Sequence, residues 1–576
     1  MNRVRISIQA LAEADFATPD RHDDMSVATA RALGGTSNLW GARCVIYDPV
    51  DFVPRPGLVN ASWPISYDEI FPHYARACQI ADAGDVVYSA PIPGLTCPDD
   101  SFTFDTLERW ANEQKLHVTH RKLLARSPLI DVRLRCVVTD IGVSPDGRVR
   151  DVEIVRADGE ERRRLGVDRL VIAAGGLESA RLLLATQRRH ANLFGGPDGP
   201  LGRYYMGHLI GEIADITMAT GDIDKAFDFF VHDSGSYVRR RFVPSMETQL
   251  REGVLNTALW PVVPPVADPR HGSPILSLVY LVMALGPVGR LVVAEAIRRR
   301  HIPDAPREIK AHLQNVLKGA PEAMAQAAGF LMRRYGRRER LPGLFVHNRN
   351  RRYGLSYHSE HSPDPLSRVW LTDKTDALGL PRLEIDLRFP RSDAQSVVKV
   401  HDLFENWLET TGFGRIDYRM PREERVASVM AQARHGTHQI GMIRMGANAR
   451  EGVVDGNLRS FDLPNLFVTS TAVLPTSGQA NPTLTAMALA VRLAGRLSAE
   501  SEGKVTPFRK VNMRVLSFRA FPPIWNHSVS AKAGWSARKA AKAVPAVRAS
   551  PADAADVRPP GNPKGRGHSS RRLRRA

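Results

Sequence analysis

One stretch of the chain decides the fold class: residues 465–497, NLFVTSTAVLPTSGQANPTLTAMALAVRLAGRL. The stretch begins with a short apolar run, residues 465–470, which is typical of a buried strand. It ends with an Ala- and Leu-rich run, residues 484–497, which predicts a buried helix. Pro482 suits the first helical position, and Asn481 directly before it is a preferred N-cap. A strand, a turn and a helix in succession predict an α/β fold.

A histidine and an asparagine bracket this predicted strand. His438 lies just upstream, in residues 436–446, GTHQIGMIRMG. Because one strand-turn-helix unit can bring both side chains into one pocket, we predict a catalytic site at His438 and Asn481. The positive end of the helix dipole beside Asn481 would stabilise a nearby anion by about 0.3–1 kcal/mol. The alternatives are that Asn481 only caps its helix and that His438 is a structural loop residue; we take His435 as structural.

Two Gly-rich segments lie earlier in the chain. Residues 31–44 read RALGGTSNLWGARC, and residues 168–184 read DRLVIAAGGLESARLLL. Together with His438-x-x-Gly441 and Asn481-Pro482-Thr483, and in this order, they closely resemble the glucose-methanol-choline (GMC) family of flavin oxidoreductases. In that family the first segment lies against FAD, and the second forms a strand, a Gly turn and a helix beneath the cofactor.

The resemblance implies an α/β fold, α+β overall, with two domains that are each built from separated stretches of the chain. The first is a Rossmann-like FAD-binding domain, which we assign to residues 1–45, 126–208 and 435–500. The second is a substrate-binding domain with a mainly antiparallel sheet and helices, which we assign to residues 46–125 and 209–434.

Local patterns predict further strands in both domains. Residues 134–141 and 149–156 are apolar runs joined by a Pro-Asp-Gly turn signal at 145–147. Residues 368–372 and 382–389 alternate polar and apolar side chains, as strands with one buried face do.

The resemblance also implies the roles of individual residues. His438 is expected to take the hydroxyl proton of an alcohol while the hydride passes to the flavin, and Asn481 to hold the substrate oxygen. Contacts to FAD are expected from Gly34, Gly35, Thr36, Asn38, Trp40, Gly41, Val137, Ala174, Gly175, Ser470, Pro482 and Thr483. Some relatives bind FAD covalently through a histidine just before the tryptophan of the first loop. Leu39 stands there in this chain, so noncovalent FAD is expected.

The family's first element is missing from the sequence. A βαβ unit with G-x-G-x-x-G would hold the FAD pyrophosphate, but nothing before Gly34 fits this fingerprint. We therefore expect an N-terminal truncation, with two readings. In the first, the start codon is assigned too far downstream, and the protein oxidises the CH–OH group of an alcohol, sugar or polyol. In the second, the chain is a noncatalytic remnant whose basic tail binds anionic partners. A nicotinamide dehydrogenase is disfavoured, because a downstream ribose-binding acid is missing too.

Composition and charge bear on the tail, on metal binding and on the location of the protein. The chain has 576 residues, 43% hydrophobic residues and a net charge of +18. Residues 531–576 hold 12 Lys or Arg against two Asp. Because they are also rich in Ala, Pro and Gly, we predict that the tail, residues 501–576, is disordered. The four cysteines show no zinc spacing, so no metal and a reducing compartment are expected. No signal peptide is visible, which favours a cytoplasmic location.

One apolar stretch bears on membrane contact. Residues 273–289 are uncharged but short for a bilayer span and are interrupted by Gly286-Pro287, so a buried helix is predicted. Arg298, Arg299 and Arg300 follow, which leaves a helix resting on a membrane surface as the less favoured alternative. The expected partners are an alcohol or sugar substrate and an electron acceptor, either oxygen, a quinone or a protein. Nucleic acid is not expected.

Overall fold

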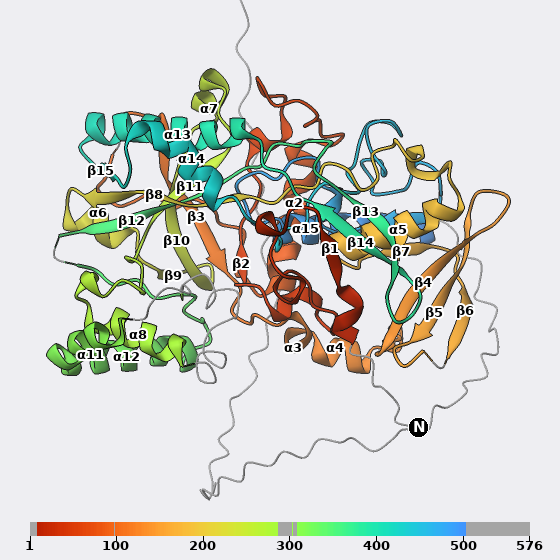
Figure 1. The fold of residues 1–576 in the computed structure, drawn as a ribbon, viewed down its shortest axis with the longest axis horizontal. Helices are drawn as coiled ribbons and strands as arrows, with labels where there is room; N and C mark the ends of the chain where they lie inside the picture. Colours follow the sequence, from red (N-terminus) through yellow and green to blue (C-terminus); the bar gives the residue numbers. More distant parts are fainter. Residues whose placement is uncertain are drawn as a thin grey trace, which may run out of the picture. The chain divides into compact units, whose positions relative to one another are not determined.

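A computed structural model describes most of the chain, namely residues 8–96, 98–159, 161–285, 302, 308–348 and 350–502. The predicted disordered tail therefore lies outside the described residues, except for its first two positions. Figure 1 shows the arrangement of the elements.

The largest sheet has eight strands in the order β15-β8-β12-β11-β10-β3-β2, with β9 paired to β10. All neighbouring strands in it are antiparallel. The strands are β2 (Arg43–Cys44), β3 (Phe102–Trp110), β8 (Leu209–Met218), β9 (Phe230–His232), β10 (Ser236–Pro244), β11 (Thr257–Val262), β12 (Arg352–Ser359) and β15 (Gly414–Tyr418). The predicted antiparallel sheet is confirmed.

Two groups of helices lie near this sheet in the drawing. In Figure 1 α13 (Arg391–Thr411) and α14 (Arg422–Gln432) lie above it, and α8 (Pro274–Ala284), α11 (Ile309–Lys318) and α12 (Ala320–Tyr335) lie below it. The buried side chains of α13 recur every three to four residues, which gives the helix one apolar face. From that face Phe404 packs on Phe102 of β3 and on Phe242 of β10, with ring centroids 5.1 and 4.8 Å apart.

The strand-turn-helix unit predicted from residues 465–497 is confirmed. β16 (Leu466–Val468) leads through a turn to α15 (Thr483–Glu502). β16 pairs in parallel with β7 (Leu170–Ile172), which in turn leads to α5 (Gly176–Arg189). α15 packs on α2 (Tyr67–Ala81), where the hydroxyls of Tyr74 and Thr485 are 2.9 Å apart. Two β-to-α units therefore lie side by side with their turns at the same end of the strands.

Two smaller sheets complete the described fold. β4 (Cys136–Val143), β5 (Val149–Arg156) and β6 (Arg162–Gly166) form an antiparallel sheet, which confirms the predicted pair of strands and their turn. β13 (Arg368–Thr375) and β14 (Pro381–Asp386) confirm the two strands predicted there. They pair in antiparallel fashion, and β1 (Ala14–Phe16) joins β14 in parallel. The remaining short helices are α1 (Met25–Ala28), α3 (Leu116–Thr119), α4 (Arg121–Arg126), α6 (Gly221–Ala226) and α7 (Met246–Glu252).

The predicted N-cap of the last helix is wrong. The first helical hydrogen bond runs from the Ala486 N–H to the Pro482 carbonyl at 3.0 Å, so Pro482 occupies the cap position and α15 begins at Thr483. Asn481 lies one residue outside the helix. Its side-chain amide is turned toward His438, which is the physical reason for the difference.

Two other expectations concern helices and cysteines. α8 buries Ile275, Leu276, Tyr280 and Met283, as predicted for the first part of residues 273–289; residues 286–289 lie outside the described part. Among the described helices, none has the length and apolar character needed to cross a bilayer. Cys44, Cys78 and Cys136, the cysteines in the described ranges, are free.

Candidate active site

The two predicted catalytic side chains are in contact. The Nδ2 atom of Asn481 lies 3.1 Å from the Nε2 atom of His438. Because an amide NH₂ group only donates, His438 Nε2 must accept and therefore carries a lone pair. The other polar atom of the amide, Asn481 Oδ1, is buried and has no hydrogen-bond partner among the residues that the structure describes.

Backbone pairing explains why a third residue, His208, reaches this site. Met206 and Ile440 form an isolated antiparallel bridge, with N–H to carbonyl distances of 2.9 and 3.1 Å in the two directions. Two residues along from such a bridge on each strand, the side chains again stand opposite each other. His208 therefore faces His438, and their Nδ1 atoms are 2.8 Å apart.

The hydrogen bonds assign the tautomer of each ring. Since His438 Nε2 accepts, its Nδ1 carries the proton and donates to His208 Nδ1. The proton of His208 is then on Nε2, which donates to the Ser477 carbonyl at 3.2 Å. His208 thus holds the His438 ring in the form whose Nε2 lone pair points to Asn481.

The site keeps its imidazoles uncharged at neutral pH. Burial lowers the pKa of His438 well below its usual value, and the nearby His435, His208 and Arg43 lower it further. Burial lowers the pKa of His208 and of His358 in the same way, and the rings of these two residues stack with centroids 4.3 Å apart. Neutral His438 is therefore able to accept a proton at pH 7.

Three of these rings also have the composition of a metal site. Ligand atoms of His208, His358 and His438 all lie within 4.8 Å of one another. Three histidines are a common donor set for a divalent ion such as zinc. In the described arrangement, however, Nδ1 of His208 and Nδ1 of His438 are hydrogen-bonded to each other, and a metal ion would have to replace that bond.

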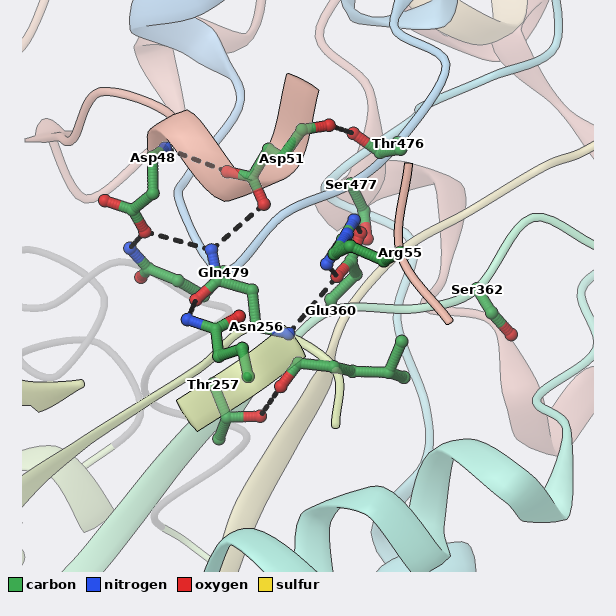
Figure 2. A network of polar contacts seen from close by, with 12 residues as sticks. Asp48, Asp51, Arg55, Asn256, Thr257, Glu360, Ser362, Thr476, Ser477 and Gln479 are labelled. Carbon is green, nitrogen blue, oxygen red and sulfur yellow. Dashed lines mark hydrogen bonds and ion pairs between the residues drawn. The ribbon is translucent and has the colours of Figure 1, made fainter. Parts of the chain in front are cut away.

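The turn that carries Asn481 is held by a network of buried polar side chains, drawn in Figure 2. Gln479 is at its centre. Gln479 Nε2 donates to Asp48 Oδ2 at 2.9 Å, its Oε1 accepts from Arg241, and its backbone carbonyl accepts from His358 Nδ1. Through His358, the network reaches the imidazole cluster directly.

A second layer of the same network involves Asn256 and Asp51 (Figure 2). Asn256 Nδ2 donates to Asp48 Oδ2 at 2.9 Å and to Asp51 Oδ1 at 3.0 Å. Burial and the nearby carboxylates of Glu360 and Asp48 raise the pKa of Asp51 well above its usual value. Gly478 packs on this carboxyl in a left-handed conformation, with φ +56°, and a Cβ there would lie 2.8 Å from Asp51 Oδ2. Only glycine fits such a position without strain.

The first predicted cofactor loop is a tight turn with internal hydrogen bonds. Gly34 and Gly35 both have positive φ, and Asn38 Nδ2 donates to the Gly35 carbonyl at 2.9 Å. Thr36, which lies between Gly35 and Asn38 in the sequence, is exposed. Trp40 Nε1 donates to the Gln114 carbonyl at 2.6 Å, which ties the end of the loop to the segment of Gln114. Gly41, the residue after Trp40, is exposed.

The second set of predicted cofactor residues gathers at one edge of the β7–β16 pair. Ala174 and Gly175 follow β7, Ser470 follows β16, Thr483 begins α15, and Pro482 directly precedes it. Because parallel strands end at the same edge of a sheet, the turns after β7 and β16 come together there. Val137 is elsewhere: it lies on β4 and packs against the cluster of Leu11, Val155 and Leu378.

Gln439 joins the catalytic loop to this edge. Its Oε1 accepts from the Leu177 N–H in the first turn of α5 at 3.0 Å, and its carbonyl accepts from Thr471 Oγ1 at 2.6 Å. Its Nε2 donates to the Ala28 carbonyl at 3.0 Å, shortly before the first cofactor loop. That loop is also tied to α5 by the ion pair of Arg31 with Glu178.

The predicted cofactor loops leave space beside their backbone. Gly35, Gly41 and Gly175 each border open space, since a Cβ added at any of them would meet no atom within 4 Å. A flat ring therefore has room against these backbone segments. Asn481 Oδ1 and His358 Nε2 add two buried polar atoms that lack partners among the described residues.

Several residues of the site were not found from the sequence. They are His208, His358, Gln439, Gln479, Asp48, Asp51, Asn256 and Arg241. Gln439 and Gln479 stand inside the stretches that carry His438 and Asn481, but nothing local indicates which residues they contact. The partners within the set are far away in the chain: His208 and His438 are 230 residues apart. The signal that brings them together is strand pairing, which a single sequence does not reveal.

Comparison with known proteins supports a family assignment for one part of the chain. Residues 363–490 match the GMC oxidoreductase family. The fructose dehydrogenase large subunit of Gluconobacter japonicus is 30% identical over 148 residues, 25% of each chain. The long-chain-alcohol oxidase FAO1 of Arabidopsis thaliana is 36% identical over 75 residues, 12% of this chain and 10% of the oxidase.

These matches are partial. They span between a tenth and a quarter of the length of the curated relatives. A fungal aryl-alcohol oxidase structure aligns over 85% of this chain and 89% of its own, with 14% identity and a TM-score of 0.46. The part of the chain that is similar to the GMC oxidoreductases, residues 363–490, includes His438 and Asn481.

Proposed function

We propose that this protein oxidises the CH–OH group of an alcohol, sugar or polyol to a carbonyl, with FAD as hydride acceptor and His438 as base. One observation carries the proposal. A lone-pair nitrogen, His438 Nε2, and an amide donor, Asn481 Nδ2, lie 3.1 Å apart. An alcohol hydroxyl needs an acceptor for its hydrogen and a donor for its oxygen, and these two atoms supply both.

The roles of the two residues follow from this geometry. A substrate hydroxyl that enters between them would donate to His438 Nε2 and accept from Asn481 Nδ2. His438 would then take the hydroxyl proton as the carbinol carbon is oxidised, a contribution worth roughly 10²- to 10⁴-fold in rate. FAD, when bound, would supply the acceptor for the hydride.

Residues around the pair would hold the cofactor and stabilise charge. The loop at Gly34 and Gly35, the turn at Gly175, and Ser470 would contact FAD. α15 begins two residues after Asn481 and runs for 20 residues, so its positive dipole end lies at the site. It would stabilise negative charge that develops there.

The names of the relatives point to the substrate class. Two of the matched proteins are named as an alcohol oxidase and a fructose dehydrogenase, which act on CH–OH groups. We infer the same class of donor here, with an electron acceptor that regenerates the oxidised cofactor.

The central test is a histidine substitution with a matched control. After reconstitution with FAD, His438→Gln should lower turnover with alcohol or sugar donors by about 10²- to 10⁴-fold. Its flavin absorption should stay equal to that of the wild type. His401→Gln, which changes another buried histidine on α13, should keep turnover. Unchanged turnover in His438→Gln would refute the role of the base, and a wild-type chain that takes up no FAD would favour the noncatalytic alternative.

We also infer that FAD is held without a covalent bond, since Leu39 occupies the position before Trp40. Acid precipitation of the loaded protein should leave the flavin in the supernatant. A yellow pellet would overturn this inference and direct attention to His117, whose Nδ1 lies against Gly34.

A further inference from the structure

We propose that α11 and α12 form a docking face for an anionic lipid surface. Large apolar side chains are concentrated on these two helices. They carry seven of the 21 large hydrophobic residues that are exposed in the described part of the chain. The seven are Ile309 (43% exposed), Leu313 (46%), Leu317 (76%), Met324 (66%), Leu331 (52%), Met332 (65%) and Tyr335 (58%). We call this set the α11–α12 face.

The helices are oriented so that this face points outward. On α11 the exposed apolar residues recur at every fourth position, Ile309, Leu313 and Leu317, which places them in one stripe. The other side of α11 is fixed to the protein by His312. This ring is buried, stacks on Tyr280 of α8 with centroids 4.1 Å apart, and lies 3.1 Å from Ser277 Oγ.

α12 also has one side packed on the protein and apolar side chains on its exposed side. Ala323 is buried where α12 packs on α8, while Met324 and Met332 are exposed. In Figure 1 α8, α11 and α12 lie together at one edge of the drawing, away from the β7–β16 pair. The apolar residues of the face thus belong neither to the core nor to the candidate active site.

Exposure of this kind is costly in water. Burying apolar surface is favourable, and exposed apolar side chains that gather in one place mark interaction sites. A partner that covers this face would therefore be stabilised by the apolar surface that it buries.

The charge around the face identifies the kind of partner. Residues 308–340 hold seven Lys or Arg and three Glu, a net charge of +4. Lys310, Lys318, Arg333 and Arg337 have no carboxylate partner within 4 Å among the described residues. Basic side chains next to an anionic membrane are attracted by its headgroups. Apolar side chains bordered by cations fit a layer of acyl chains beneath acidic headgroups.

Two alternatives fit less well. Nucleic acid would meet the cations but would leave the Leu and Met side chains in water. None of the described helices is long and apolar enough to cross a bilayer, so the contact would be with the surface.

The test is vesicle flotation of the full chain in two lipid compositions. Vesicles of phosphatidylglycerol and phosphatidylcholine should carry the wild type upward in a density gradient, and pure phosphatidylcholine vesicles should carry roughly tenfold less. Leu317→Glu/Met332→Glu should lose roughly tenfold in flotation with the acidic vesicles. Its matched control is Val59→Glu/Leu366→Glu, which places two charges at equally exposed apolar positions elsewhere, 70% and 54% exposed, and should float as the wild type does.

The design separates this face from the basic tail, because the tail is present in every protein tested. Equal flotation of the Leu317→Glu/Met332→Glu variant and the wild type would overturn the proposal and assign binding to another part of the chain. If the face instead binds a second copy of the chain, light scattering should show a dimer for the wild type and a monomer for Leu317→Glu/Met332→Glu, and neither protein should float with vesicles. That result would also overturn the proposal. Equal melting temperatures of variant and control show that both are folded.

Discussion

The Arg55 guanidinium and the Glu360 carboxylate form a bidentate ion pair inside the protein. Nη2 of Arg55 lies 2.7 Å from Oε1 of Glu360, and Nη1 contacts Oε2. The two side chains are only 3% and 0% exposed. The backbone N–H of Asn256 lies 3.3 Å from the same carboxylate, so the pair belongs to the network that holds the Asn481 turn (Figure 2).

Removing one partner of this pair should be strongly destabilising. Glu360→Gln leaves the Arg55 cation buried without its counter-ion, and such losses amount to about 3–5 kcal/mol in the free energy of unfolding. Urea unfolding measures the difference. The control is Asp131→Asn, which breaks the exposed pair of Arg133 and Asp131, 49% and 73% exposed, and should cost less than about 1 kcal/mol. An equal loss of unfolding free energy in the two variants would show that the buried pair contributes no more to stability than the exposed pair.

His208 should control catalysis through the tautomer of His438. His208→Leu removes the acceptor for the His438 Nδ1 proton, so the ring loses the hydrogen bond that keeps its Nε2 lone pair toward Asn481. We expect kcat to fall roughly 10- to 100-fold. His208→Gln offers an amide oxygen in place of the imidazole nitrogen and should recover part of the rate. A purely structural role for His208 would give the two variants the same kcat and shift only their stability.

The pH dependence of kcat/KM should show the low pKa of His438. Protonated His438 has no lone pair to accept the hydroxyl proton, so the rate must fall as the pH falls through the pKa of the free enzyme. Because burial and the nearby His435, His208 and Arg43 lower that pKa, the acidic limb should lie below pH 6.5. Arg43→Met removes one of the charges that lower the pKa and should move the limb to higher pH. An acidic limb at or above pH 6.5 in the wild type would contradict this account.

A buried histidine on α13, His401, should affect stability in acid. Burial lowers the pKa of His401 to about 4. Between pH 6.5 and 4 the unfolded chain binds this proton and the folded chain does not, so the free energy of unfolding falls as the pH falls through this range. One such group contributes up to about 1.4 kcal/mol per pH unit. His401→Gln should reduce the slope of stability against pH between 6.5 and 4, measured by urea unfolding, and leave it unchanged above pH 7. An unchanged slope would mean that His401 is protonated in the folded protein.

The parts of the fold that the sequence predicts are those built from neighbouring residues. Residues 465–497 contain a strand, a turn and a helix in succession, and each has its own local pattern of apolar residues. Local rules place the start of the helix one residue too early, because they assign the Asn481 amide to the helix. In the folded protein the amide contacts His438, 43 residues away in the chain.

The parts that could not be predicted depend on contacts between distant segments. Arg55 and Glu360 are 305 residues apart, and neither lies in a motif. His208 reaches the site only because Met206 pairs with Ile440. Composition and periodicity indicate which segments are buried, but they do not indicate which buried segments lie beside each other.

The left-handed turn at Gly478 has a consequence for ligand binding. The turn is held on one side by the Asp51 carboxyl and on the other by the three hydrogen bonds of Gln479. Its backbone is therefore already ordered before a ligand arrives. Ordering a loop on binding costs affinity, and a preorganised one avoids that cost. The free energy of substrate binding is thus available for selecting among substrates, since none of it is spent on shaping the turn.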